Sequence, residues 1–184
     1  MNSGVLNIVI SLGAMQLARK IPFEDPEVLN YVRVGYVVVQ AIVLGVYYYV
    51  SLAIKKKNDQ TVLKYVEPAS PMSGEEPKLV TTTVRDYDLA ETSKLLRSAY
   101  MGIAMMAVMH IYFKFTQPLF IQSLMGLKTL YDAKPVAIHL LGKPATGELK
   151  RPFKTPALFG PPTGPQTDAA AIAEAEKRVG KKEE

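Results

Sequence analysis

The most constraining feature of this chain is an uncharged stretch of 21 residues, 34–54, which is followed at once by Lys55, Lys56 and Lys57. At about 1.5 Å per residue, a helix of that length covers about 31 Å, close to the hydrocarbon thickness of a bilayer. Basic residues usually flank such a helix on its cytosolic side. The core helix of a soluble protein is the alternative, but it rarely lacks charge for so long. The stretch therefore predicts a membrane-spanning helix.

Three more apolar segments, 4–18, 89–115 and 118–131, complete the expected architecture. Asp25 and Pro26 indicate where the second helix begins, and Asp88 with Glu91 has the spacing of a capping box for the third. The fourth segment is compatible with a return span, a re-entrant piece or an interfacial helix. The predicted fold class is an all-α membrane protein, a small helical bundle of three to four short hydrophobic helices with a cytosolic polar loop and an extended basic C-terminal tail.

The composition shifts along the chain predict four regions. Residues 1–57 hold the first and second membrane helices, and residues 58–88 form a cytosolic loop that includes a strand-like run at 79–84. Residues 89–131 hold the third membrane helix and the short fourth, embedded or interfacial helix. Residues 132–184 form a basic, Pro/Gly-rich cytosolic tail with a short terminal helix.

The positions of the basic residues predict the orientation. With both termini in the cytosol and four alternating segments, only four of the 22 Lys and Arg residues lie on the far side: Arg19, Lys20, Arg33 and Lys114. The inverted orientation reverses that ratio and violates the positive-inside tendency. If the fourth segment does not cross, the basic tail lies on the far side instead.

No pattern for catalysis, a metal or a cofactor is visible in the sequence. The chain has no cysteine and only two histidines, His110 and His139, without ligand-like spacing. Residues 142–147 have a glycine-lysine pattern, but Pro144 stands where a phosphate-binding loop needs Ser or Thr. We therefore expect no catalytic residues, no cofactor, no metal site and no enzymatic activity.

Polar and methionine-rich helix faces predict a groove for client segments or for helix packing. Polar side chains in otherwise apolar segments lower the cost of bringing polar groups into lipid, although packing between helices uses the same residues. Methionines suit surfaces that bind varied apolar partners, but they also fill gaps in cores. The predicted groove consists of Asn7, Ser11, Arg33, Gln40, Met105, Met106 and His110.

The tail carries basic residues that predict contact with a phosphate-rich surface, namely Lys143, Lys150, Arg151 and Lys154. Extended basic segments bind anionic lipid headgroups or ribosomal RNA through their phosphates. A solvated linker is the alternative interpretation.

Several longer motifs together resemble one known family. They lie at residues 64–68 (KYVEP), 72–75 (MSGE), 82–89 (TTVRDYDL), 138–140 (IHL), 142–147 (GKPATG) and 149–154 (LKRPFK). The chain is similar over most of its length to the fungal inorganic-phosphate-transport family of endoplasmic-reticulum membrane proteins, which also supplies the third component of the SRP-independent targeting pathway.

The resemblance implies an endoplasmic-reticulum membrane protein that helps deliver or insert other membrane proteins. It also implies partners: the Sec61 translocon, the other SRP-independent targeting components, nascent membrane proteins and the ribosome. The second interpretation is an inorganic phosphate transporter or a subunit for maturation of one. The family supplies no catalytic motif to place on this chain.

Overall fold

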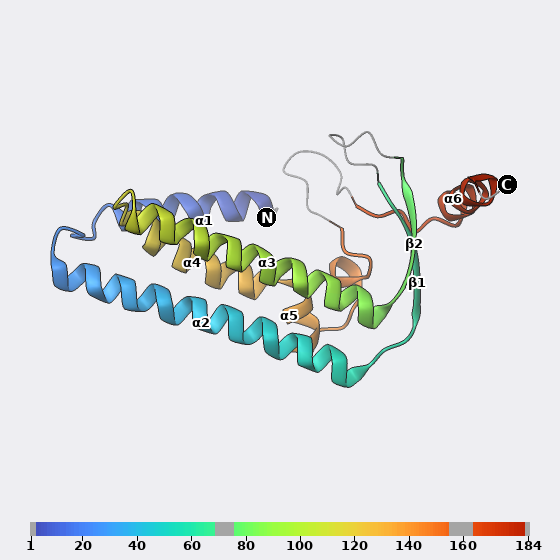
Figure 1. Cartoon of the computed structure of the whole chain (residues 1–184), viewed down its shortest axis with the longest axis horizontal. Helices are drawn as coiled ribbons and strands as arrows, with labels where there is room; N and C mark the ends of the chain where they lie inside the picture. The colour runs from blue at the N-terminus through green and yellow to red at the C-terminus, as the bar shows by residue number, and fades with distance from the viewer. Residues whose placement is uncertain (1–2, 69–75, 155–163, 183–184) are drawn as a thin grey trace. The chain divides into compact units, whose positions relative to one another are not determined.

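A computed structural model of the chain describes residues 3–68, 76–154 and 164–182. These residues form two compact units, drawn in Figure 1. The first, here called the helical unit, comprises Met1–Ala53 and Ala90–Lys143, and the second, the polar unit, comprises Ile54–Leu89 and Pro144–Glu184. The loop expected at 69–75 and the part of the extended tail at 155–163 lie outside the described residues.

The helical unit contains most of the helical structure of the described chain. It holds α1 (Ser3–Ala18), most of α2 (Pro26–Lys57) and of α3 (Val84–Ile111), α4 (Gln117–Asp132) and α5 (Lys134–His139). Within this unit α1, α2, α3 and α4 run alongside one another, as Figure 1 shows. Asp25 caps α2 as predicted, because its side chain accepts the backbone N–H of Glu27 at 2.9 Å.

The helix α2 buries only a narrow stripe of its surface. The buried positions follow one another at intervals of four and three residues, the spacing that keeps one helix face toward its neighbours: Tyr36, Gln40, Val43, Tyr47, Val50 and Ile54. Large apolar side chains on the remaining surface are more than 45% exposed, among them Val34, Val37, Val38, Ile42 and Leu52. A helix whose outward faces are this apolar differs from the half-polar surface helix of a soluble domain.

Among the described residues, α2 is the one helix long and apolar enough to cross a membrane. Its most apolar 18-residue window has a mean hydropathy of 2.0, and 28% of that window is buried. The segment Val5–Ala18 is apolar but shorter. The expectation of several membrane crossings therefore stays a prediction for α1, α3 and α4.

Small residues set the contact between α1 and α4. Ala14 and Ala18 are 3% and 0% exposed, and the Ser11 hydroxyl lies 3.5 Å from the Met125 sulfur of α4. These two helices approach more closely than the other long helices of the unit. Close approach through small side chains is the mode of packing available to helices that cannot draw on the hydrophobic effect.

The polar unit corrects the all-α prediction. Its strands β1 (Val62–Glu67) and β2 (Lys78–Thr83) pair antiparallel, with Val62 opposite Thr83 and Glu67 opposite Lys78. The strand-like run near 79–84 was predicted, whereas β1 was not. The terminal helix α6 (Ala169–Lys182) packs against both strands, and Figure 1 shows it beside them.

The start of α3 also differs from the prediction, which placed a capping box at Asp88. The helix begins at Val84, and the Thr83 hydroxyl accepts the backbone N–H of Asp86 at 3.2 Å. The N–H groups of Val84 and Arg85 donate to carbonyls of the segment before β1, at Thr61 and Asp59. Asp88 lies four residues after the first residue of the helix and pairs with Arg151 instead of capping the helix.

Asp88 and Arg151 form a buried ion pair in the polar unit. The two side chains are 1% and 12% exposed, and Arg151 donates from Nε and Nη2 to the two carboxylate oxygens at 2.6 Å each. The Tyr87 hydroxyl accepts the Phe153 N–H at 2.7 Å, and the Tyr87 ring packs edge-on against Tyr65 and Phe153. Residues 151–153 are thereby held against the start of α3.

The connection after α2 contains an exposed acid with an altered pKa. The hydroxyl and the backbone N–H of Thr61 both donate to Asp59, and these hydrogen bonds lower the pKa of the Asp59 carboxyl below its ordinary value. The turn between α2 and β1 thus favours the ionised form of the Asp59 side chain.

The α2–α4 contact predicts how Gly126 responds to substitution. A Cβ at Gly126 meets the Gln40 amide, Val39 and Val43 at 3.9–4.0 Å, which is ordinary contact. Gly126→Ala should therefore leave the thermal unfolding of the purified full-length chain in detergent unchanged. Gly126→Leu should destabilise it by about 1–3 kcal/mol through overpacking. Equal unfolding temperatures for both variants, followed by circular dichroism, would contradict this packing.

The buried ion pair makes a second prediction. Arg151→Met leaves the Asp88 carboxylate buried without its cation and should destabilise the polar unit by about 3–5 kcal/mol. Adding Asp88→Asn to that variant should recover a large part of the loss, because no buried charge is left. Denaturant unfolding by circular dichroism measures both variants. A double variant less stable than Arg151→Met would refute the pairing.

Candidate functional site

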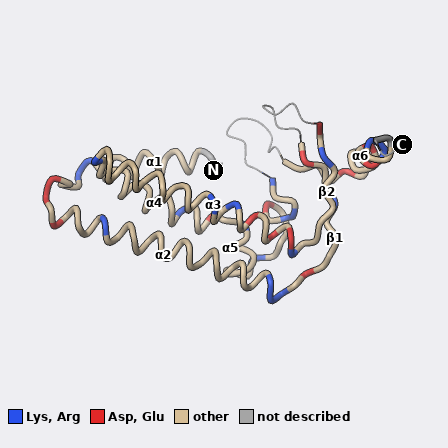
Figure 2. Tube along the Cα trace, viewed as in Figure 1, with Lys and Arg blue, Asp and Glu red and all other residues tan. Residues whose placement is uncertain are grey.

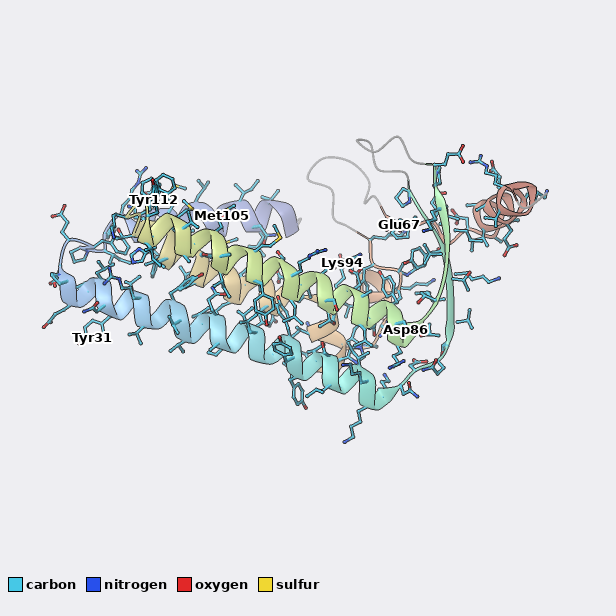
Figure 3. All side chains as sticks on the ribbon, viewed as in Figure 1. Tyr31, Glu67, Asp86, Lys94, Met105 and Tyr112 are labelled. Carbon is cyan, nitrogen blue, oxygen red and sulfur yellow. The ribbon has the colours of Figure 1, made fainter. Side chains whose placement is uncertain are left out.

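The helical unit places polar side chains among its helices and leaves apolar side chains outside. Figure 2 shows long uncharged stretches in α1, α2 and α4, with charged residues gathered at the turn between α1 and α2. On α3, Met101, Met105 and Tyr112 are 66%, 67% and 78% exposed, and in Figure 3 Met105 and Tyr112 point away from the ribbon. This distribution is the reverse of that in a soluble helical domain.

At one end of the unit, Arg33 of α2 and His110 of α3 are hydrogen-bonded. Arg33 Nε donates to His110 Nε2 at 3.0 Å, and His110 Nδ1 lies 2.8 Å from the Phe115 carbonyl oxygen. A guanidinium has no lone pair to offer, so Nε2 must be the acceptor. Nδ1 therefore carries the proton and donates to Phe115, which defines a neutral imidazole.

Two glutamines lie further along the helices, each beside a glycine. Gln40 is 8% exposed, and its amide nitrogen lies near Gly126 of α4. The amide nitrogen of Gln122 on α4 would lie only 2.9 Å from a Cβ at Gly102 on α3. Gly102 therefore makes room for the Gln122 amide, whereas Gly126 lies beside the Gln40 amide at an ordinary contact distance.

Two polar atoms in this interior have no hydrogen-bond partner among the described residues: the Tyr36 hydroxyl and Gln122 Oε1. An unpaired buried polar atom costs about 1–3 kcal/mol. Together with the residues above they form what we call the polar seam: Arg33, Tyr36, Gln40, His110 and Gln122. Tyr36 and Gln40 are buried, His110 and Gln122 are partly buried, and Arg33 is exposed at one end.

The seven predicted groove residues do not line one surface. Arg33, His110 and Gln40 belong to the seam, and Met106 is buried beside them against Tyr36 and Leu119. Ser11 contacts Met125 at the α1–α4 contact, whereas Asn7 and Met105 are exposed. The structure thus brings four of the seven together.

The four basic residues that were predicted to contact a phosphate-rich surface do not belong to one unit. Lys143 Nζ lies 5.7 Å from the centre of the Tyr131 ring in the helical unit. In the polar unit Lys150 and Lys154 are exposed, but the Arg151 guanidinium is already occupied by Asp88. Lys143, Lys150 and Lys154 keep exposed side chains that a phosphate-rich surface can reach.

Sequence reasoning did not include Tyr36 or Gln122 among the site residues. Tyr36 lies three residues after Arg33 and four before Gln40, which is the spacing of one helix face, and Gln122 is an amide in an otherwise apolar segment. The additional signal is the pair Gly102 and Gly126, two glycines inside apolar helices. Over the described ranges, no three His, Cys, Asp or Glu side chains are grouped to hold a metal ion.

The Arg33–His110 contact predicts a specific histidine tautomer. In the full-length chain near neutral pH, we expect the ring nitrogens of His110 to show Nδ1 protonated and Nε2 as the acceptor. Nitrogen-15 NMR of histidine-labelled protein distinguishes the tautomers. Arg33→Met should remove the bias toward this form, whereas Arg19→Met, at an exposed position outside the contact, should not. A dominant Nε2–H form in the unaltered chain would refute the geometry.

Comparison with known proteins gives a consistent result. The family model "Phosphate transport (Pho88)" matches residues 1–183. The chain is 51% identical to "SRP-independent targeting protein 3" of Saccharomyces cerevisiae, over 96% of this chain and 95% of that protein. It is 42% identical to the "SRP-independent targeting protein 3 homolog" of Schizosaccharomyces pombe, over 95% of this chain and 91% of that protein. A search of solved structures finds no match.

Proposed function

This chain belongs to the Pho88 phosphate-transport family, and from that premise we propose that it acts in SRP-independent targeting of membrane proteins. It is a non-catalytic factor of the endoplasmic-reticulum membrane that helps deliver and insert client helices. The chain spans the membrane several times, with both termini in the cytosol. The similarity to relatives named as SRP-independent targeting proteins supports a targeting role.

The observation that carries the insertion step is the polar seam inside an apolar exterior. Exposed apolar side chains on α2 and α3 suit a surrounding of lipid chains. Within that surrounding, the Tyr36 hydroxyl and Gln122 Oε1 lack partners among the described residues. A client segment that inserts between the helices brings a polar side chain to these buried atoms, and the transfer of that side chain into the apolar phase then costs less.

The proposed partners follow the same division of the chain. The helical unit contacts the Sec61 translocon and nascent membrane proteins within the bilayer. The polar unit, with the loop and tail in the cytosol, meets the other targeting components and the ribosome. Exposed Lys150 and Lys154 there, and Lys143 of the helical unit, contact phosphates of ribosomal RNA or of anionic lipid headgroups.

Phosphate transport is the second candidate, because the family description names it. The cation best placed for such a path, Arg33, already donates to His110 and to the Asn30 side chain at 3.3 Å. A role in maturation of a phosphate transporter fits the family description without conduction through this chain.

The seam makes the proposal testable. Tyr36→Phe combined with Gln122→Leu removes the two unpartnered atoms at nearly constant volume. We expect thermal stability to be unchanged or higher, because buried unsatisfied groups are lost. Insertion of clients with polar residues in their membrane segments should fall about tenfold, whereas clients with fully apolar segments should insert normally. Insertion into microsomes that carry the variant, scored by glycosylation of the client, measures this.

The matched control is Ser123→Ala, because that hydroxyl is already satisfied by the Leu119 carbonyl at 2.8 Å. It should leave insertion of both client classes unchanged. Normal insertion of polar clients by the double variant would sink the role of the seam. Saturable phosphate flux into vesicles containing this chain alone, lost in Arg33→Met, would establish the second candidate instead.

A further inference from the structure

The helical unit has a hollow between its two connections at one end. Residues 21–24, which join α1 to α2, form one wall, and residues 114–118, which join α3 to α4, form the other. The hollow is open to the outside and has a volume of about 560 Å³, within the range of about 300–1,000 Å³ that is common for small-molecule sites. None of the lining residues belongs to the polar seam.

Both walls are held by hydrogen bonds of their own. In the first, the N–H groups of Phe23 and Asp25 donate to the carbonyls of Ile21 and Pro22 at 2.9 and 3.1 Å. In the second, the Phe115 carbonyl accepts from His110 Nδ1, and the Phe115 N–H donates to the Met109 carbonyl at 3.0 Å. The walls are therefore ordered before any ligand enters, which lowers the entropic cost of binding.

The lining combines apolar walls with one acid and one base. Ile21, Phe23 and Phe115 contribute apolar surface, while Glu24 and Lys114 contribute opposite charges. Within the described part of the chain, neither Glu24 nor Lys114 forms an ion pair. A ligand with a phosphate group, an ammonium group and an apolar body matches this lining: the phosphate pairs with Lys114, the ammonium group pairs with Glu24, and the apolar body contacts the apolar walls.

Exposed aromatic rings place this hollow at the depth of lipid headgroups. Tyr112 and Phe113 are 78% and 55% exposed and pack edge-on with ring centres 5.0 Å apart, and Phe115 is 51% exposed. Exposed Tyr and Phe rings at the end of an apolar helix are typical of the membrane–water interface. Charged residues gather at the same end, in the turn between α1 and α2 (Figure 2).

We propose that this hollow binds the headgroup of one zwitterionic glycerophospholipid. Lys114 Nζ contacts the phosphate, the Glu24 carboxylate contacts the ammonium group, and the rings of Phe23 and Phe115 cover the glycerol and the first acyl carbons. The site does not depend on the role in targeting, and its test measures lipid binding without any client.

The test uses the full-length chain purified in mild detergent, with bound lipid counted by native mass spectrometry. Phosphatidylcholine and phosphatidylglycerol are added separately at equal concentration. The unaltered chain should retain one phosphatidylcholine and bind phosphatidylglycerol more weakly. Lys114→Asn removes the cation and suits the backbone there, whose φ of 62° is in the left-handed region where Asn is enriched. It should weaken both lipids about tenfold.

Glu24→Gln gives the sharper result. It should weaken phosphatidylcholine and strengthen phosphatidylglycerol, so that the ratio of the two affinities falls about tenfold. The control variants Lys20→Asn and Glu27→Gln change the same charges outside the hollow and should leave that ratio unchanged. Circular dichroism checks that every variant is folded.

Three results would overturn the proposal. The first is a preference for phosphatidylcholine over phosphatidylglycerol that Glu24→Gln does not change. The second is a loss of lipid affinity in Lys20→Asn or Glu27→Gln as large as in the variants of the hollow. The third is displacement of the bound lipid by an equimolar amount of inorganic phosphate. The last result would assign the hollow to a free anion. Glycerophosphocholine alone should bind more weakly than the intact lipid, because it lacks the apolar part that the aromatic walls cover.

Discussion

The narrow buried stripe of α2 is the contact on which the helical unit is built. Positions Tyr36, Gln40 and Val43 face α3 and α4, and the rest of the helix surface, mostly valine, leucine and tyrosine, faces outward. In water, so much exposed apolar surface would drive aggregation. In the proposed bilayer location, lipid chains would remove that penalty. They would also remove the hydrophobic drive between helices, so that close packing and interhelical hydrogen bonds would hold the bundle together.

Specific residues in the helical unit provide this close packing and these interhelical hydrogen bonds. Ala14 and Ala18 let α1 approach α4, and Gly102 leaves room for the Gln122 amide inside the bundle. Arg33 and His110 satisfy each other across α2 and α3. The Tyr36 hydroxyl and Gln122 Oε1 remain without a hydrogen-bond partner among the described residues, which lowers stability. Packing alone does not require these two polar atoms, since phenylalanine and leucine would fill nearly the same volume.

Local signals predicted the fold better than distant ones did. Asp25 beside Pro26 fixed the start of α2, because a cap depends only on neighbouring residues. The prediction that Asp88 caps α3 was wrong, because the role of Asp88 depends on a residue that is distant in the sequence. Its spacing from Glu91 matches a capping box, but its partner is Arg151, 63 residues further along, and the helix starts earlier, at the end of β2. The strand β1 was missed because its identity depends on pairing with β2.

The same limit applies to the candidate site. The spacing of Arg33, Tyr36 and Gln40 is that of one helix side, and in the structure Tyr36 and Gln40 are buried while Arg33 is exposed. The bond from Arg33 to His110 joins residues 77 positions apart, and Gln122 meets Gly102 across two helices. No local pattern encodes either contact. The glycines are the one trace that they leave in the sequence.

The lengths of the helices connect this architecture to the proposed insertion step. The neighbouring helices α1 and α4 have 16 residues each, about 24 Å of helix, against the roughly 30 Å of a bilayer core. A short hydrophobic length is accommodated by local thinning of the bilayer. Beside α1 and α4, a polar side chain of a client therefore crosses a shorter apolar distance than it does beside α2, whose uncharged stretch matches the bilayer. In the proposed insertion step, the polar seam would lower this barrier by supplying hydrogen-bond partners, and the short helices would lower it by reducing the apolar distance to be crossed.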